Sequence, residues 1–169
     1  MPGSAPRSSP TPAGSVPGLT AEECRRRLSE ARVARLATAG PGGRPHLVPI
    51  CFALDRSATE LCSAVDAKPK SGRPLRRLVN LAANPRASVL VDHYEEDWAG
   101  LWWVRVDGPA VVVDPAGDPD RHRVATGLLR ARYAQYADHA LTGPLLVLSV
   151  ERLTGWTAGP AGEGMPAAP

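Results

Sequence analysis

The chain has 169 residues, of which 43% are hydrophobic and 22% are charged, a balance typical of one soluble globular domain with a single core. Its formal net charge of +3 is mild, and basic residues are interspersed with acidic ones except around residues 68–77. This distribution argues against a nucleic-acid-binding stripe and favours local binding of a small anion.

The three cysteines form no CxxC pair, so neither a disulfide framework nor a zinc site is indicated. The N-terminus lacks the apolar core of a signal peptide, and no later run approaches membrane-spanning length. We therefore expect a cytoplasmic protein with no membrane partner and no metal. Residues 1–18 and 159–169 are rich in Pro, Gly and Ala and predict flexible tails around a single domain at 19–158.

The first predicted element is a short helix. Thr20 and Glu23 form a capping-box pattern, and apolar residues then recur at helical spacing up to about Ala31. Three β-rich runs separated by turn residues follow and predict an antiparallel meander, namely Val33–Ala39, Pro45–Leu54 and Leu61–Val65.

A basic loop follows the third run and opens a second helix. Pro74 suits the first helical position, and Asn84-Pro85 marks the end of the helix. The amides at a helix N-terminus point outward and carry partial positive charge, so this corner is suited to phosphate or carboxylate. Its basic side chains are Lys68, Lys70, Arg73, Arg76 and Arg77. A solvated helix face is the alternative interpretation of the three arginines.

Two further strands are predicted at Ala87–Asp92 and Leu101–Val113, the second bending around Gly108-Pro109. Trp102 and Trp103 are neighbours in this strand and point to opposite faces, so we expect one in the core and the other at an interface or cofactor wall.

Asp118-Pro119 predicts the start of a helix that reaches about Tyr136, and Leu145–Leu153 closes the sheet. Six strands with few, short helices favour a mainly β fold, a small barrel with peripheral helices, over a Rossmann sheet. Trp98 lies in an acidic loop, where so large an apolar ring is unusual unless a partner chain or a ligand covers it.

Five segments in this order resemble the flavin/deazaflavin oxidoreductase family, the split β-barrel proteins related to pyridoxamine 5′-phosphate oxidase. They are RVARLATAGPGGRPHLVPICFALD, AVDAKPK, RLVNLAANPRASVLVDHYEEDW, LWWVRVDGPA and ARYAQYADHALTGPLLVLSVERLTGW. More narrowly, the chain is similar to the probable F420-dependent enzymes of the PPOX class. The resemblance covers nearly everything between Leu19 and Ala158. It implies an FMN-binding-type split β-barrel and a homodimer with two cofactor sites at the interface, each built from both chains.

The resemblance also implies which residues contact the cofactor. The backbone of three residues would face the isoalloxazine or deazaflavin ring, and three others would run beside the cofactor's side chain: Pro49, Ile50 and Cys51, then Ser63, Ala64 and Val65. Lys68 and Lys70 would hold the phosphate. Arg76 and Asn80 would reach the phosphate or a more distal carboxylate, and Trp98 and Trp103 would come from the partner chain.

The cofactor implied is F420, with FMN as the alternative. F420 carries one phosphate and several carboxylates, whereas FMN carries only the phosphate. Each charge-assisted contact contributes roughly 1.5–3 kcal/mol when partly desolvated, so five basic residues exceed what one phosphate needs and favour F420.

The activity implied is hydride transfer between F420 and a small electrophilic organic substrate. The cofactor carries the hydride, which explains why no catalytic triad or carboxylate pair is visible. His46, His93 and Tyr94 are candidate proton donors by residue type only. A non-catalytic cofactor- or haem-binding protein is the alternative from another class. Haem is the weaker option because no histidine stands in an obviously ligating context.

Overall fold

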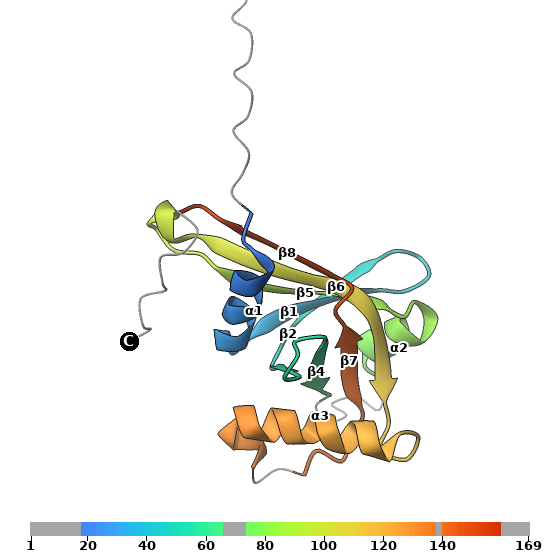
Figure 1. Ribbon diagram of the computed structural model, residues 1–169. Helices are drawn as coiled ribbons and strands as arrows, with labels where there is room; N and C mark the ends of the chain where they lie inside the picture. Colours follow the sequence, from blue (N-terminus) through green and yellow to red (C-terminus); the bar gives the residue numbers. More distant parts are fainter. Residues whose placement is uncertain (1–17, 66–73, 138–139, 160–169) are drawn as a thin grey trace, which may run out of the picture.

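The computed structural model describes residues 18–65, 74–137 and 140–159, which form three α-helices and eight β-strands (Figure 1). In chain order the elements are α1 Ala21–Glu30, β1 Ala34–Ala39, β2 Pro45–Ile50, β3 Ala53–Leu54, β4 Glu60–Ala64, α2 Arg76–Ala83, β5 Arg86–His93, the 3₁₀ helix η1 Trp98–Gly100, β6 Trp102–Val113, α3 Pro119–Arg132, the 3₁₀ helix η2 Ala134–Tyr136, β7 Leu145–Ser149 and β8 Arg152–Thr157. The mainly β prediction is confirmed. Lys68, Lys70, Arg73 and most of the two predicted tails lie outside the described residues.

The strands form one curled antiparallel sheet in the order β2-β1-β5-β6-β7-β4-β3, with β8 pairing with β6. Strand β6 connects the two halves of the sheet. Its first part, residues 102–107, pairs with β5 and β8, and its last part, residues 110–113, pairs with β7. Figure 1 shows β6 curving from the long β5–β8 half down to the β4–β7 half.

The predicted bend in β6 depends on Gly108. A Cβ atom at this position would lie 1.9 Å from the carbonyl oxygen of Ser149, far inside any real contact. The β7–β8 turn is also held close to Gly108, because the Glu151 amide donates to the carbonyl of the preceding residue, Asp107, at 3.1 Å. Glycine therefore lets the β7–β8 turn cross the bend of β6.

The apolar interior consists of two clusters on either side of the β4–β7 half. The larger one lies between α1, α2 and the inner face of β1, β5 and β6, with Val89, Val104 and Val106 fully buried. The smaller one packs α3 against β3, β4 and β7 around Leu129 and Val147. Strand β7 serves both clusters, because its successive side chains alternate between the two faces.

The sequence predicted correctly where two helices begin. Thr20 and Glu23 form the capping box at the start of α1, with each side chain bonding the other residue's backbone amide. Asp118 caps α3 by accepting from the Arg121 amide at 3.1 Å, and Pro119 is the first residue of that helix.

Two runs that were predicted as single strands are each divided into two. Pro45–Leu54 breaks at Cys51 and Phe52 into β2 and β3. Leu145–Leu153 breaks after Ser149, because the Val150 amide donates to the Thr59 carbonyl at 2.8 Å and turns the chain toward β6. The sheet therefore has eight strands among the described residues instead of six.

Two helix limits also differ from the prediction. Helix α2 begins at Arg76, two residues after Pro74, because Leu75 keeps an extended conformation and packs against the larger cluster. Helix α3 ends at Arg132, because Tyr133 leaves the helical conformation and its hydroxyl bonds to distant backbone. Among the described residues no helix is long and apolar enough to cross a membrane.

Candidate cofactor site

The break between β2 and β3 lies beside β4. Ser63, buried in β4, donates its hydroxyl to the carbonyl of Cys51 at 2.8 Å. Strand β3 pairs with β4 so that Ala53 lies opposite Cys62. The two predicted ligand-facing segments, residues 49–51 and 63–65, are thus adjacent in the fold, and a side-chain hydrogen bond links them.

The exposure of these six residues favours backbone contact with a ligand. The side chains of Ile50, Ser63 and Val65 are buried, with 7%, 2% and 6% of their surface exposed. Pro49 is exposed, and Cys51 and Ala64 are half-buried. A ligand at the break would therefore meet main-chain groups and small side chains, as predicted for the ring of a flavin or deazaflavin. The contact itself stays a prediction.

Tyr133 fixes the same break from the opposite side, a role that the sequence analysis did not predict. Its hydroxyl accepts from the Phe52 amide at 3.0 Å and lies 2.8 Å from the Phe52 carbonyl and 2.7 Å from the Arg32 carbonyl. The residue follows α3 directly, so its side chain connects the end of that helix to two loops far away in the sequence. Phe52 and its neighbour Cys51 are held in place by this hydroxyl.

Cys62 is a packing residue. Its thiol faces the α3 cluster, 3.6 Å from the Ala125 carbonyl, and burial raises the pKa of Cys62 to about 12. Burial also raises the pKa of Cys24, which lies on the buried face of α1. Both thiols stay protonated near neutral pH and behave as small apolar groups.

A groove lies between α2 and the β1–β2 hairpin, with a volume of about 460 Å³. Arg44, His46, Arg76 and Asn80 line it, and no carboxylate is found among the lining residues that the structure describes. Asn80 is 4% exposed, and its amide nitrogen donates to the Thr38 hydroxyl at 3.0 Å, which attaches α2 to β1. The structure thus brings Arg76 and Asn80 together, although the Asn80 amide group already has a structural partner.

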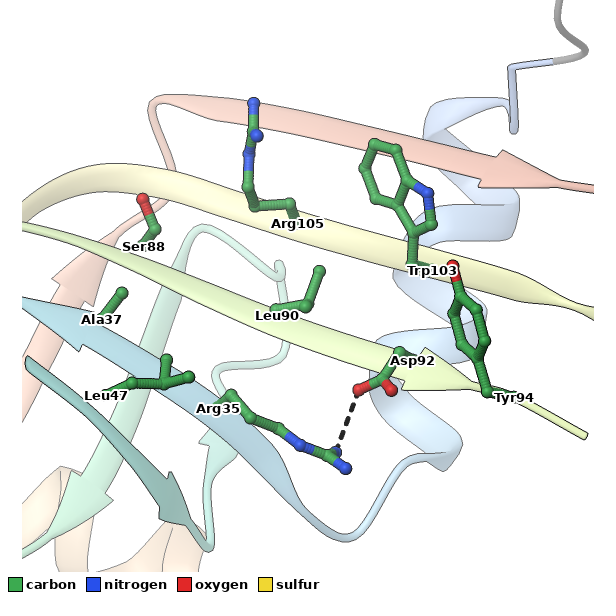
Figure 2. A pocket seen from close by; sticks show the side chains of 9 residues that line it. All are labelled: Arg35, Ala37, Leu47, Ser88, Leu90, Asp92, Tyr94, Trp103 and Arg105. Atoms are coloured by element: carbon green, nitrogen blue, oxygen red, sulfur yellow. Dashed lines mark ion pairs between the residues drawn. The ribbon is translucent and has the colours of Figure 1, made fainter. Parts of the chain in front are cut away.

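The outer face of the β2-β1-β5-β6 sheet carries a cavity of about 550 Å³ (Figure 2). An ion pair between Arg35 and Asp92 crosses it at 3.0 Å, and Tyr94 and Trp103 lie at one end. Pro49 pairs with Arg35 across the β1–β2 ladder, so the predicted ring-facing segment adjoins this face.

The two neighbouring tryptophans point to opposite faces of the sheet, as predicted. Trp102 points inward, is 5% exposed and has the Arg27 guanidinium 4.6 Å from its ring centroid. Trp103 points outward into the cavity of Figure 2. Trp98 lies in η1 with 77% of its surface exposed and is not among the residues that line this cavity. Its predicted cover, a partner chain or a ligand, stays a prediction.

The sequence model of a known family, described as pyridoxamine 5′-phosphate oxidase, matches residues 20–156. The chain belongs to this family. The match includes every described helix and strand except the last residue of β8. The curled sheet described above is therefore the split-barrel fold of this family.

Solved structures with this fold come from proteins with different ligands. An FAD-binding protein from Mesorhizobium loti is 28% identical over 83% of this chain and 96% of its own, with a TM-score of 0.61. A conserved hypothetical protein from Mycobacterium tuberculosis is 20% identical over 94% and 99%, with a TM-score of 0.67. The haem storage protein HutZ from Vibrio cholerae is 17% identical over 80% and 93%, with a TM-score of 0.59. No curated protein matches the chain significantly.

The three histidines in the described residues lie in different environments. His122 is buried with its Nε2 2.9 Å from the Gly143 carbonyl. His93 stacks on Trp102, with 6.2 Å between ring centroids, and its Nε2 is 3.5 Å from a Glu95 carboxylate oxygen. His46 lines the α2 groove. Across the part of the chain that the structure describes, no three His, Cys, Asp or Glu side chains gather in a way that would hold a metal ion.

Proposed function

We propose that the protein is an oxidoreductase that binds F420 and transfers a hydride between this deazaflavin and a small electrophilic organic molecule. Membership of a family named for an oxidase and similarity to an FAD-binding protein support a flavin-type cofactor. The bound cofactor would supply the hydride, and the protein would supply binding, orientation and exclusion of water.

The observation that favours F420 over FMN is the groove beside α2. Arg44 and Arg76 line it, and none of the described residues that line it is a carboxylate. The Nδ1 atom of His46 is buried with no hydrogen-bond partner in the described structure. These donors suit carboxylate groups beyond the phosphate. The phosphate itself would be held by Lys68 and Lys70, as the family resemblance implies. A single phosphate would leave this second set of donors without an acceptor.

FMN in the same site is the alternative cofactor. Haem is the alternative from another class, because HutZ shares the fold, but a five-coordinate haem needs an accessible axial ligand. His122 is buried against Gly143, and the Nε2 of His93 lies 3.5 Å from a Glu95 carboxylate oxygen, so these two of the described histidines do not favour that role.

The proposed cofactor site also bears on the oligomeric state of the protein. Residues 49–51 adjoin the outer sheet face, which carries Trp103 and the exposed side chains of Leu47 and Tyr94, 64% and 66% exposed. We propose that this face meets its counterpart in a homodimer and that Trp98 and Trp103 of each chain complete the partner's cofactor site. A monomer would expose this apolar surface.

The deciding experiment is a fluorescence titration of the full-length protein with F420, repeated with FMN at the same salt concentration. We expect micromolar or tighter binding of F420 and at least roughly tenfold weaker binding of FMN. The double variant Lys68→Ala/Lys70→Ala should weaken F420 binding with an unchanged unfolding temperature. A preference for FMN would overturn the F420 proposal, and undiminished binding by the double variant would overturn the phosphate assignment.

A further inference from the structure

A second groove, with a volume of about 730 Å³, lies between α1, the β3–β4 turn and α3. None of its lining residues belongs to the predicted cofactor segments 49–51 and 63–65 or to α2. Figure 1 shows the β3–β4 hairpin between α1 and α3, and both helices contact β3. Five arginines from all these parts of the chain line the groove: Arg25, Arg26, Arg32, Arg56 and Arg132.

Four of these arginines have no acidic partner among the described residues. Arg26 pairs with Glu30 at 3.0 Å, but the remaining ion pairs of the described chain involve residues outside this groove. Within the described residues, Arg32 donates only to the Arg132 carbonyl, at 2.6 Å, and Arg132 donates to the carbonyls of Ala31 and Leu28. Guanidinium groups gathered without counter-charge repel one another, and a bound anion would relieve this repulsion.

The two carboxylates that line the groove do not neutralise it. Burial opposes the ionisation of Asp55, but hydrogen bonds from Ser57, Thr59 and the Glu60 amide lower the pKa of Asp55 below its ordinary value. Its two oxygens accept five such bonds and are therefore engaged within their own turn. Glu22 is exposed at the rim and has no ion pair in the described structure. Among the described residues, five guanidinium groups thus face these two carboxylates and Glu30, the partner of Arg26, so positive charge is in excess.

Two of the arginines are already ordered. The Arg32 guanidinium lies 4.7 Å from the ring centroid of Tyr133, and that of Arg132 lies 5.4 Å from the ring centroid of Phe52. The Nε of Arg132 is buried and has no hydrogen-bond partner in the described structure. Because folding has already fixed these side chains, an anion that binds here loses less of its affinity to side-chain ordering.

The groove also has an apolar part. Leu54, Leu128 and Ala131 line it between the arginines of α1 and those of α3 and the turn. Leu54 and Leu128 are only half-buried against the core clusters, so part of each side chain faces the groove. A purely inorganic anion would leave this surface unused.

We propose that this groove is a second ligand site, separate from the cofactor site, which binds an organic phosphate. The phosphate oxygens accept from the arginines, for which the planar guanidinium is the best-suited donor. The apolar or ring portion of the ligand lies on Leu54 and Leu128. The proposal is that the groove binds this ligand, and it includes no reaction of the ligand.

The test is isothermal titration calorimetry of the full-length protein with adenosine diphosphate, and with pyrophosphate as the arm that lacks an organic part. We expect both probes to bind and the nucleotide to bind more tightly. The double variant Arg25→Gln/Arg56→Gln should weaken nucleotide binding by roughly five- to tenfold, because two exposed charges are lost. Both side chains are exposed and make no described contact, so the unfolding temperature should not change.

Two further variants separate this groove from other basic surface. Arg130→Gln removes an exposed arginine of α3 that does not line the groove, and it should leave nucleotide affinity unchanged. Lys68→Ala/Lys70→Ala should also bind the nucleotide normally, and Arg25→Gln/Arg56→Gln should bind F420 normally. Equal affinity of wild type and Arg25→Gln/Arg56→Gln for the nucleotide would overturn the site, and equal affinity for the two probes would overturn an organic ligand.

Discussion

At the scale of single residues, the least predictable contact is made by Tyr133. Its hydroxyl bonds Phe52, 81 positions earlier in the chain, and Arg32, 101 positions earlier. Local spacing carries no information about such partners, and the sequence placed this residue inside a helix. The sequence did predict features that follow from a residue's own strand or cap, such as the opposite directions of Trp102 and Trp103 and the Thr20 capping box.

Replacing Tyr133 with phenylalanine should destabilise the protein by about 1–3 kcal/mol, because the buried Phe52 amide loses its acceptor. Cofactor affinity should fall as well, since Cys51 adjoins the freed backbone. Urea unfolding gives the first quantity and F420 titration gives the second. Tyr94→Phe is the matched control because Tyr94 is 66% exposed. Equal stabilities of the two variants would show that the hydroxyl does not hold the break.

Cys62 predicts a pH dependence of stability. Its pKa is about 12 in the folded protein and near its ordinary value of 9.0 in the unfolded chain. The unfolded chain therefore releases this proton first, and the folded state loses stability as pH rises above about 9. By about pH 10 the loss from this group should reach about 1.4 kcal/mol. Urea unfolding of wild type and Cys62→Ala at about pH 8 and pH 10 isolates the contribution of this thiol. An identical change in the free energy of unfolding between the two pH values in both proteins would contradict the prediction.

At the scale of elements, the sequence predicted where helices and strands exist better than where continuous apolar runs divide. Pro45–Leu54 and Leu145–Leu153 each look like one strand, because apolar residues continue through the break. The division comes from hydrogen bonds to other elements, from Ser63 to Cys51 in the first case and from Val150 to Thr59 in the second. The bend in β6 was predictable because a Gly-Pro pair marks it locally.

Gly108 and Gly127 offer a matched pair of substitutions. Gly108→Ala should destabilise the protein by at least about 1–3 kcal/mol, because its Cβ would overlap the Ser149 carbonyl and push the β7–β8 turn away from β6. Gly127→Ala should stabilise the protein by up to about 1 kcal/mol, because the residue is helical and its Cβ would meet open space. Thermal unfolding of both variants shows whether each substitution lowers or raises stability. A stabilised Gly108→Ala would show that the β7–β8 turn does not pack closely against β6.

At the scale of the whole molecule, the order of five sequence segments was enough to predict the split barrel and the family. The sequence could not predict the grooves, because each is lined by side chains from elements far apart in the chain. The α2 groove joins Arg44 and Arg76, and the arginine groove joins α1, the β3–β4 turn and α3. Substrate choice depends on surfaces of the same kind, so the residues that select the substrate were not predictable either.

The proposed homodimer makes the final prediction. Leu47 is 64% exposed on the outer sheet face, so Leu47→Glu should leave the fold of each chain intact but place a carboxylate in the interface. We expect light scattering at micromolar concentration to show a dimer for wild type and a monomer for the variant. The variant's F420 affinity should fall in parallel, because each site would lose the partner's Trp98 and Trp103. Val124→Glu, at a 57% exposed position on α3, should remain a dimer. A Leu47→Glu dimer with normal F420 affinity would place the interface on another face, and a monomeric wild type that binds F420 tightly would show that one chain alone forms the site.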